Sequence, residues 1–398
     1  MKISSKILII IALVGLFFQT NSLYAQGEAA VPFLLLAPDS RAGGIGESGS
    51  GLSDNSAAIF WNPAGIAFLD GTELSITHSN WLPQFKLDLF YEYATFRHYI
   101  PSIGGSVTSS ITYMNYGEFV RTASNSPDPI GTFRSFDAAL TLGYATKLSP
   151  SWGVGGNLRL IHSRLSDKPT EYETGTGVAT TVSFDVAGMW RPQSLPIPLL
   201  GNLGKKLSMG VNLSNIGPKI YYLDQEQADP IPTNFRLGIA MRLLDLDYNS
   251  LTYTVDFSKL LVDKGKAFRG TVDTNGTPVK RKEFYETIFT AWADQPFNEE
   301  LRDIVTSMGL EYWYGVPGNF MFALRAGFFY EDPDYGNRKF ITLGAGIRYD
   351  MYGFDFSYIT TSVFKGMENH PLAETLRFTL QIGWGSILKP SKGFPSGL

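Results

Sequence analysis

The sequence predicts an all-β protein: a transmembrane antiparallel β-barrel of about 14 strands, with an N-terminal plug segment in its lumen. Three observations indicate this fold. From residue 72 onward, apolar side chains alternate with polar or small ones. The alternating segments have about the 9–11 residues that a tilted strand needs to cross a bilayer. The connections between these segments mostly alternate between long and short, as expected of an outer-membrane barrel with both termini in the periplasm.

Composition excludes several other classes. Of the 398 residues, 44% are hydrophobic and 18% are charged, with a net charge of −4, which argues against disorder and against a nucleic-acid binder. Past the N-terminus there is no apolar run of about 18 residues, which excludes a helical membrane protein. The chain has no cysteine and four histidines. We therefore expect no disulfide, no cysteine nucleophile, no metal site and no cofactor.

Residues 1–25 are typical of a signal peptide. Lys2 and Lys6 precede the apolar stretch 7–18, and a small residue, Ala25, stands before the expected cleavage. Leu23 is larger than the residue preferred two places before the cut, so the exact bond stays open. An uncleaved anchoring helix is disfavoured by the short run and the absence of stop-transfer charges. We expect the mature chain in the outer membrane of the cell.

Residues 26–71 do not alternate and are expected to form the plug. Gly44, Gly46 and Gly49 match the pattern G-x-G-x-x-G, but no strand leads into it and no βαβ unit follows, which disfavours dinucleotide binding. Glycines instead allow close backbone packing in a confined space, and an Asn-Pro pair marks a turn. The predicted plug motif comprises Gly44, Gly46, Trp61, Asn62, Pro63 and Gly65.

Residues 72–384 form the predicted barrel. In a representative segment, Phe235 and Leu237 alternate with Arg236 and Gly238. The strands are expected near 72–78, 87–97, 104–114, 135–147, 152–163, 180–191, 206–213, 233–243, 251–258, 307–314, 320–330, 339–350, 353–361 and 374–384.

A soluble β-sandwich would also alternate, so the connections decide for the barrel. The long ones are 115–134, 164–179, 214–232 and 259–306, and the short ones include 98–103, 148–151, 315–319 and 351–352, with 192–205 as an exception. Charged residues of the later strands share the face opposite the bulky apolar side chains, where a closed barrel must pair them. The expected lumenal ion pairs involve Glu311, Arg325, Arg348, Asp355 and Arg377.

Two N-terminal runs carry a resemblance to a known family. Residues 40–46 (Ser-Arg-Ala-Gly-Gly-Ile-Gly) and 61–65 (Trp-Asn-Pro-Ala-Gly) resemble the signature of the PorV/PorQ group, which is related to FadL-type barrels. The C-terminal part is similar to the PorV family of type IX secretion system outer-membrane proteins at 311–314, 323–331, 336–339, 342–346, 355–358, 369–372 and 375–378. The tail, residues 385–398, departs from the pattern because it continues past the last strand.

The resemblance implies a non-enzymatic function in Bacteroidota. PorV-like proteins bind the C-terminal signal domains of cargo at the SprA-type translocon and pass the cargo to the attachment complex that contains the PorU-type sortase. The alternative is a FadL-like transporter of hydrophobic small molecules. No catalytic residue is expected, since the pairs His78-Ser79 and His162-Ser163 lie on strands, where neighbouring side chains face opposite ways.

The connection 259–306 is too long to be a simple spacer. It contains a hairpin-like turn at 274–277 and an amphipathic helix expected from Glu283 to Trp292. The apolar face of this helix is compatible with folding over the barrel mouth and with docking a partner. The residues expected to bind cargo or a partner at the extracellular rim are Trp81, Phe85, Phe119, Tyr172, Tyr221, Tyr222, Phe284, Ile288, Trp292 and Phe364.

Overall fold

The computed structural model describes most of the chain after the predicted signal peptide. The described residues are 29–123, 126–166, 175–198, 201–223, 228–262, 282–316, 319–361, 363–364 and 370–385. The predicted signal peptide, 1–25, and all of the predicted tail except its first residue lie outside this set. Among the described helices, none is both long and apolar enough to cross a membrane.

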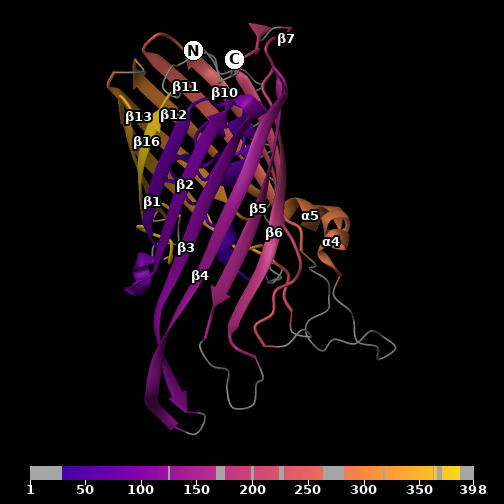
Figure 1. Ribbon diagram of the computed structural model, residues 1–398, viewed down its shortest axis with the longest axis vertical. Coiled ribbons are helices and arrows are strands. Elements are labelled where there is room, and N and C mark those ends of the chain that lie inside the picture. The colour runs from indigo at the N-terminus through magenta and orange to yellow at the C-terminus, as the bar shows by residue number, and fades with distance from the viewer. Residues whose placement is uncertain are drawn as a thin grey trace.

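Fourteen strands of the described chain form one closed antiparallel barrel, as predicted (Figure 1). Neighbours along the chain pair with each other, and β1 pairs with β16 to close the ring. β7 (Pro196–Ile197) and β8 (Gly201–Asn202) form a separate hairpin, so β6 pairs directly with β9. The barrel strands are β1 (Thr72–Asn80), β2 (Phe90–Ile100), β3 (Gly105–Ala123), β4 (Ser126–Ser149), β5 (Trp152–Arg164), β6 (Val178–Trp190), β9 (Leu207–Ile216), β10 (Asn234–Asp245), β11 (Asn249–Leu260), β12 (Val305–Gly315), β13 (Met321–Tyr330), β14 (Lys339–Tyr349), β15 (Tyr352–Thr360) and β16 (Leu376–Trp384).

The barrel wall is apolar outside and polar inside. On β1, Leu74 and Ile76 are 38% and 54% exposed, whereas Ser75 and Thr77 are 5% and 0% exposed. Apolar side chains stay exposed around the ring, including Ile111, Leu142, Leu158, Val186, Leu324, Leu343 and Leu380. This polarity is the reverse of that of a soluble β-protein and fits hydrocarbon around the wall. The soluble sandwich is therefore excluded.

The hairpin of β3 and β4 extends far beyond the predicted strands. Residues 115–134 were expected as a long loop, but Glu118 pairs with Arg134 and Arg121 with Gly131. The alternation is broken because the register shifts between Asn115 and Glu118, where Gly117 has a φ of +85°. The loop prediction is therefore wrong for most of this segment, and Figure 1 shows the hairpin projecting from the barrel at the end opposite β7.

Residues 29–71 lie inside the ring of strands (Figure 1). Ser40 N donates to Thr379 Oγ1 on β16 (3.0 Å), and Ser50 N donates to Asp256 Oδ2 on β11 (2.8 Å). Asn157 on β5 donates to the carbonyl of Ile59 (2.8 Å). These three strands are spaced around the whole ring, so the segment occupies the lumen. Its short helices are η1 (Pro32–Leu35), α2 (Ser40–Gly43), α3 (Ala58–Trp61) and η2 (Pro63–Phe68).

Glycines on both sides let the segment approach the wall. Gly46 has a φ of +75°, and a Cβ there would lie 2.5 Å from the carbonyl oxygen of Met308 and 2.7 Å from the nitrogen of Phe328. Gly327 on β13 faces it, and a Cβ at that position would overlap the backbone of Gly46. Only two residues without side chains can meet at this distance.

Two further helices, α4 (Phe284–Thr290) and α5 (Phe297–Arg302), lie beside the barrel rather than over its mouth (Figure 1). α4 is the helix predicted in the long connection, and Glu283 caps it together with Glu286. The predicted turn at 274–277 lies outside the described residues. Single 3₁₀ turns, η3 (Pro83–Phe85) and η4 (Pro101–Ile103), follow β1 and β2.

Leu158→Arg is expected to destabilise the barrel by about 2–4 kcal/mol, because Leu158 lies on the outer face midway along β5. Leu148→Arg, at the short-turn end of β4, is expected to cost only about 0–1 kcal/mol, because its guanidinium reaches the interface. Denaturant unfolding from lipid vesicles measures both changes. Equal losses in the two variants would contradict a lipid-facing outer wall.

Candidate functional site

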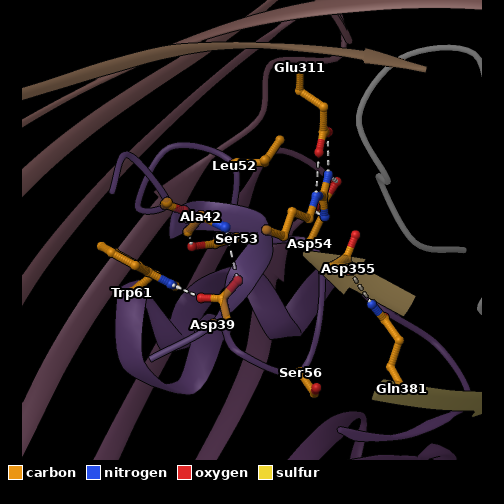
Figure 2. A network of polar contacts seen from close by, with 12 residues as sticks. Asp39, Ala42, Leu52, Ser53, Asp54, Ser56, Trp61, Glu311, Asp355 and Gln381 are labelled. Carbon is orange, nitrogen blue, oxygen red and sulfur yellow. Dashed lines mark hydrogen bonds and ion pairs between the residues drawn. The ribbon is translucent and has the colours of Figure 1, made fainter. Parts of the chain in front are cut away.

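A chain of alternating charges joins the N-terminal segment to the inner wall. Arg41, at the start of α2, donates to both oxygens of Glu311 on β12, from Nε and Nη2, each at 2.7 Å. Its Nη1 donates to Asp54 Oδ1 at 2.5 Å. Figure 2 shows the paired bonds that reach Glu311 from the segment. A bidentate contact of this kind neutralises the charge of Glu311 and also fixes the segment against the wall.

The chain continues across the last strands. Arg325 on β13 donates to Glu311 Oε2 and to Asp355 Oδ1, both at 2.8 Å, and Arg348 on β14 donates to Asp355 Oδ2 at 2.6 Å. Gln381 on β16 donates to the same oxygen of Asp355 at 2.8 Å. Glu311, Arg325 and Asp355 are each at most 4% exposed. The structure therefore brings four of the five predicted ion-pair residues into one network.

The fifth residue, Arg377, has a different partner. Its Nη2 donates to Glu47 of the N-terminal segment at 2.9 Å, and its guanidinium lies 5.9 Å from the centre of the Trp81 ring. Arg377 is 1% exposed. The segment thus contributes Glu47 as well as Arg41 to the pairing of lumenal charges.

The residues of the predicted plug motif hold the segment's own fold. Trp61 Nε1 donates to Asp39 Oδ1 at 2.6 Å, while the other oxygen of Asp39 accepts from Ala42 N at 3.0 Å and caps α2 (Figure 2). Asn62 Oδ1 accepts from Ala64 N at 3.0 Å, which caps η2. Asn62 Nδ2 donates to the carbonyl of Gly188 on β6 at 3.1 Å.

The other motif residues act through the Pro63 ring or through the missing side chain of glycine. Pro63 occupies the first position of η2, where its missing N–H costs no hydrogen bond. A Cβ on Gly65 would overlap the backbone of Ser53, and Gly44 approaches Gly344 on β14 in the same way. The six residues therefore support packing against the wall, and a function of the segment as a plug stays a prediction.

A hollow of about 220 Å³ lies between the segment and the wall. It is lined by Leu34, Leu35, Phe60, Arg159, Ser214, Asn215, Asn234 and Arg236. Five of these eight residues are polar or charged. The hollow is therefore poorly suited to a hydrophobic small molecule.

At the extracellular rim, three predicted binding residues are well exposed. Phe85 and Tyr221 are each 52% exposed and Phe119 is 45% exposed. Phe119 stacks on Phe133 across the projecting hairpin, with 5.6 Å between ring centres. These side chains come from the connection after β1, the β3–β4 hairpin and the connection after β9. They form an aromatic rim that stands clear of the lumen.

Four other predicted rim residues differ from this group. Trp81 is partly buried against Arg377, and Phe364 lies 5.9 Å from Phe328 on β13. Tyr222 donates to Ser163 Oγ at 2.8 Å, and burial raises its pKa to about 12 although that hydrogen bond lowers it. Tyr172 lies outside the described residues.

The predicted residues of α4 make contacts with the protein itself. Phe284 and Ile288 are partly buried. Trp292, just after α4, packs edge-on against Phe235 of β10, with 5.1 Å between ring centres, and stays 43% exposed. Lys259 of β11 lies next to Trp292.

Lys259 anchors α5. Its ammonium lies 2.6 Å from both Glu300 Oε2 and Asp303 Oδ2, and it is 3% exposed. Burial opposes ionisation of Glu300, but its hydrogen bonds to Lys259 and to the nitrogen of Gln295 outweigh this and hold the pKa below its usual range. Sequence patterning missed this site because a lysine on the apolar face of a strand looks like a break in the alternation.

The acidic turn after β13 is also occupied by the chain's own cation. Arg302 of α5 donates to Asp332 Oδ1 at 2.8 Å and also to Asp334. Within the described part of the chain, no group of three or more potential ligands could hold a metal ion.

Comparison with known proteins gives one family. The model described as "Type IX secretion system protein PorV" matches residues 22–267, which is 246 of the 398 residues. A search of curated protein sequences gives no match. Among solved structures, the toluene transporter TbuX of Ralstonia pickettii is 10% identical with a TM-score of 0.43, and the alignment covers 87% of this chain and 98% of that one. A FadL homologue of Pseudomonas aeruginosa is 11% identical, with a TM-score of 0.47 and coverage of 87% and 98%. At these identities and scores the structural likeness carries no further conclusion.

Glu311→Gln is expected to destabilise the protein by about 3–5 kcal/mol, because it leaves Arg41 and Arg325 without their shared carboxylate in a buried site. Glu92→Gln is the matched control. Glu92 pairs with His78 at an exposed position, so its loss should cost about 0–1 kcal/mol. Unfolding free energies from vesicles give both values, and a small effect of Glu311→Gln would rule out the network as a structural link.

The docking of α5 against the barrel is expected to depend on pH. Because the pKa of Glu300 is depressed, its pairing with Lys259 stabilises docking above the ordinary glutamate range and is lost as the pH falls through the lowered value. Hydrogen exchange of residues 297–302, expressed as protection relative to the intrinsic rate at each pH, should be high at pH 7 and 5 and be lost only at lower pH. Lys259→Met should lack protection already at pH 7. High protection in this variant would contradict the role of the ion pairs.

Proposed function

This chain belongs to the PorV family of type IX secretion system proteins, and on that premise we propose that it binds the C-terminal signal of secreted cargo at the translocon and shuttles the cargo to the surface attachment complex. Family and fold make it a component of that secretion system in the outer membrane. The partners of this function are an SprA-type translocon, the signal domains of cargo and a PorU-type attachment complex.

The observation that carries the proposal is the filled lumen below an exposed aromatic rim. Residues 29–71 contact strands around the whole ring, so a protein domain has no room inside the barrel. We propose that this segment acts as a plug. Binding of cargo then falls to the extracellular rim, where Phe85, Phe119 and Tyr221 are exposed. Exposed aromatic side chains are the groups that most often dominate protein–protein binding.

The alternative is a FadL-like transporter of hydrophobic small molecules, the class of the toluene transporters among the structural matches. Such transport requires an apolar path through the lumen. The lining of the hollow near Arg159 and Arg236 is mainly polar, which fits such a path poorly.

Photo-crosslinkers placed singly at Phe85, Phe119 and Tyr221 are expected to label the signal domain of cargo in intact cells. Tyr93, which is 2% exposed inside the barrel, is the matched aromatic control and should give no label. Affinity isolation of the tagged protein should recover the translocon and cargo. Labelling confined to the lumenal position would exclude rim binding. Normal secretion with loss of fatty-acid uptake in a deletion strain would support the transporter instead.

A further inference from the structure

The two helices of the long connection lie against the outside of the barrel wall (Figure 1). Trp292, which follows α4, packs on Phe235, an outward side chain at the extracellular end of β10. Lys259 shares this face, because it pairs with Phe235 across β10 and β11. The next outward residue of β11 toward the periplasm, Phe257, is 37% exposed. The helices therefore begin where the exposed apolar band of the wall ends.

α5 turns its charged groups toward the barrel. Glu300 and Asp303 bind Lys259 in a buried cluster, and Arg302 binds the turn after β13. Glu299 also accepts from Arg302 at 3.1 Å, whereas Glu286 of α4 is exposed.

The opposite face of the helices is apolar and exposed. Phe289 is 79% exposed, and Phe297 is 75% exposed. Tyr285 stands four residues before Phe289 and Leu301 four residues after Phe297, with exposed fractions of 57% and 52%. Each helix therefore presents an outward stripe at helical spacing. We call the residues Tyr285, Phe289, Phe297 and Leu301 the outer stripe.

On α5 the charged groups face the barrel and the large apolar side chains face away from it, which is also the polarity of the barrel strands. In the strands this polarity reflects surrounding hydrocarbon. A monomeric protein in water rarely exposes an apolar patch of this kind without a use for it. The outer stripe continues the lipid-facing band at its extracellular limit. Contact with the hydrocarbon of the membrane therefore accounts for both.

We propose that the α4–α5 pair is an interfacial membrane element that inserts its outer stripe into the outer leaflet, against the acyl chains of the lipids. Aromatic residues at the boundary of a bilayer bury an apolar body there while polar atoms stay in the interface. The ion pairs of Lys259 and Arg302 hold the helices at this height. Residues 284–302 are thereby held beside the barrel.

Single nitroxide labels test the proposal directly, because the chain has no cysteine of its own. Phe289→Cys and Phe297→Cys are labelled in the full-length protein, in vesicles of phosphatidylethanolamine and phosphatidylglycerol. Leu158→Cys provides the reference for the bilayer centre, and Phe119→Cys provides the aqueous reference. The accessibility ratio of oxygen to a water-soluble nickel complex at 289 and 297 should exceed that at 119 and stay below that at 158.

A ratio at 289 and 297 equal to that at Phe119 would overturn the proposal. Protection that appears only after addition of translocon or cargo would overturn it as well, and would assign the outer stripe to a protein partner. Hydroxyl-radical labelling of the unmodified protein in the same vesicles covers the case in which a label disturbs the helix. Phe289 and Phe297 should be modified less than Phe119, and equal modification would again contradict membrane insertion.

Discussion

The hydrocarbon around the wall is the constraint on which the rest of the structure depends. It offers no partner for a backbone N–H or C=O, so each strand must bond to two neighbours and the sheet must close through β1 and β16. It also drives most polar side chains of the wall inward. The lumen therefore receives a set of charges that must be neutralised where water is scarce.

The N-terminal segment is the inner counterpart of that wall. Neighbouring strands pair some of the charges, as Arg325 does with Glu311 and Asp355, but Glu311 and Arg377 find their further partners on the segment. Glycines on both surfaces bring the backbones close enough for these bonds. The segment and the wall are therefore parts of one folded unit, and the rim is left as the surface for recognition.

The sequence predicted the features that follow from the local hydrophobic period. It did not predict the features that follow from which residues of two segments pair. The alternation of Phe235 to Arg242 placed a strand and its outward face correctly, because one side of the wall is uniformly apolar. The projecting hairpin was missed because the bulge at Gly117 shifts the phase between two regular halves. The inward phase of Arg377 was also readable, but its partner Glu47 lies in a segment without any period, where spacing carries no information about contacts.

The hydrophobic period also could not predict which side of α4, in the long connection, would face the barrel. Apolar residues occur on both sides of α4, so its period could not say whether Ile288 or Phe289 would face the barrel. For α5, Lys259 decides the orientation, because a lysine on the lipid-facing side of β11 requires carboxylates beside it. Glu300 and Asp303 meet that ammonium, and Phe297 and Leu301 stay exposed. A charge that looks misplaced in a single strand thus determines which side of α5 faces away from the barrel.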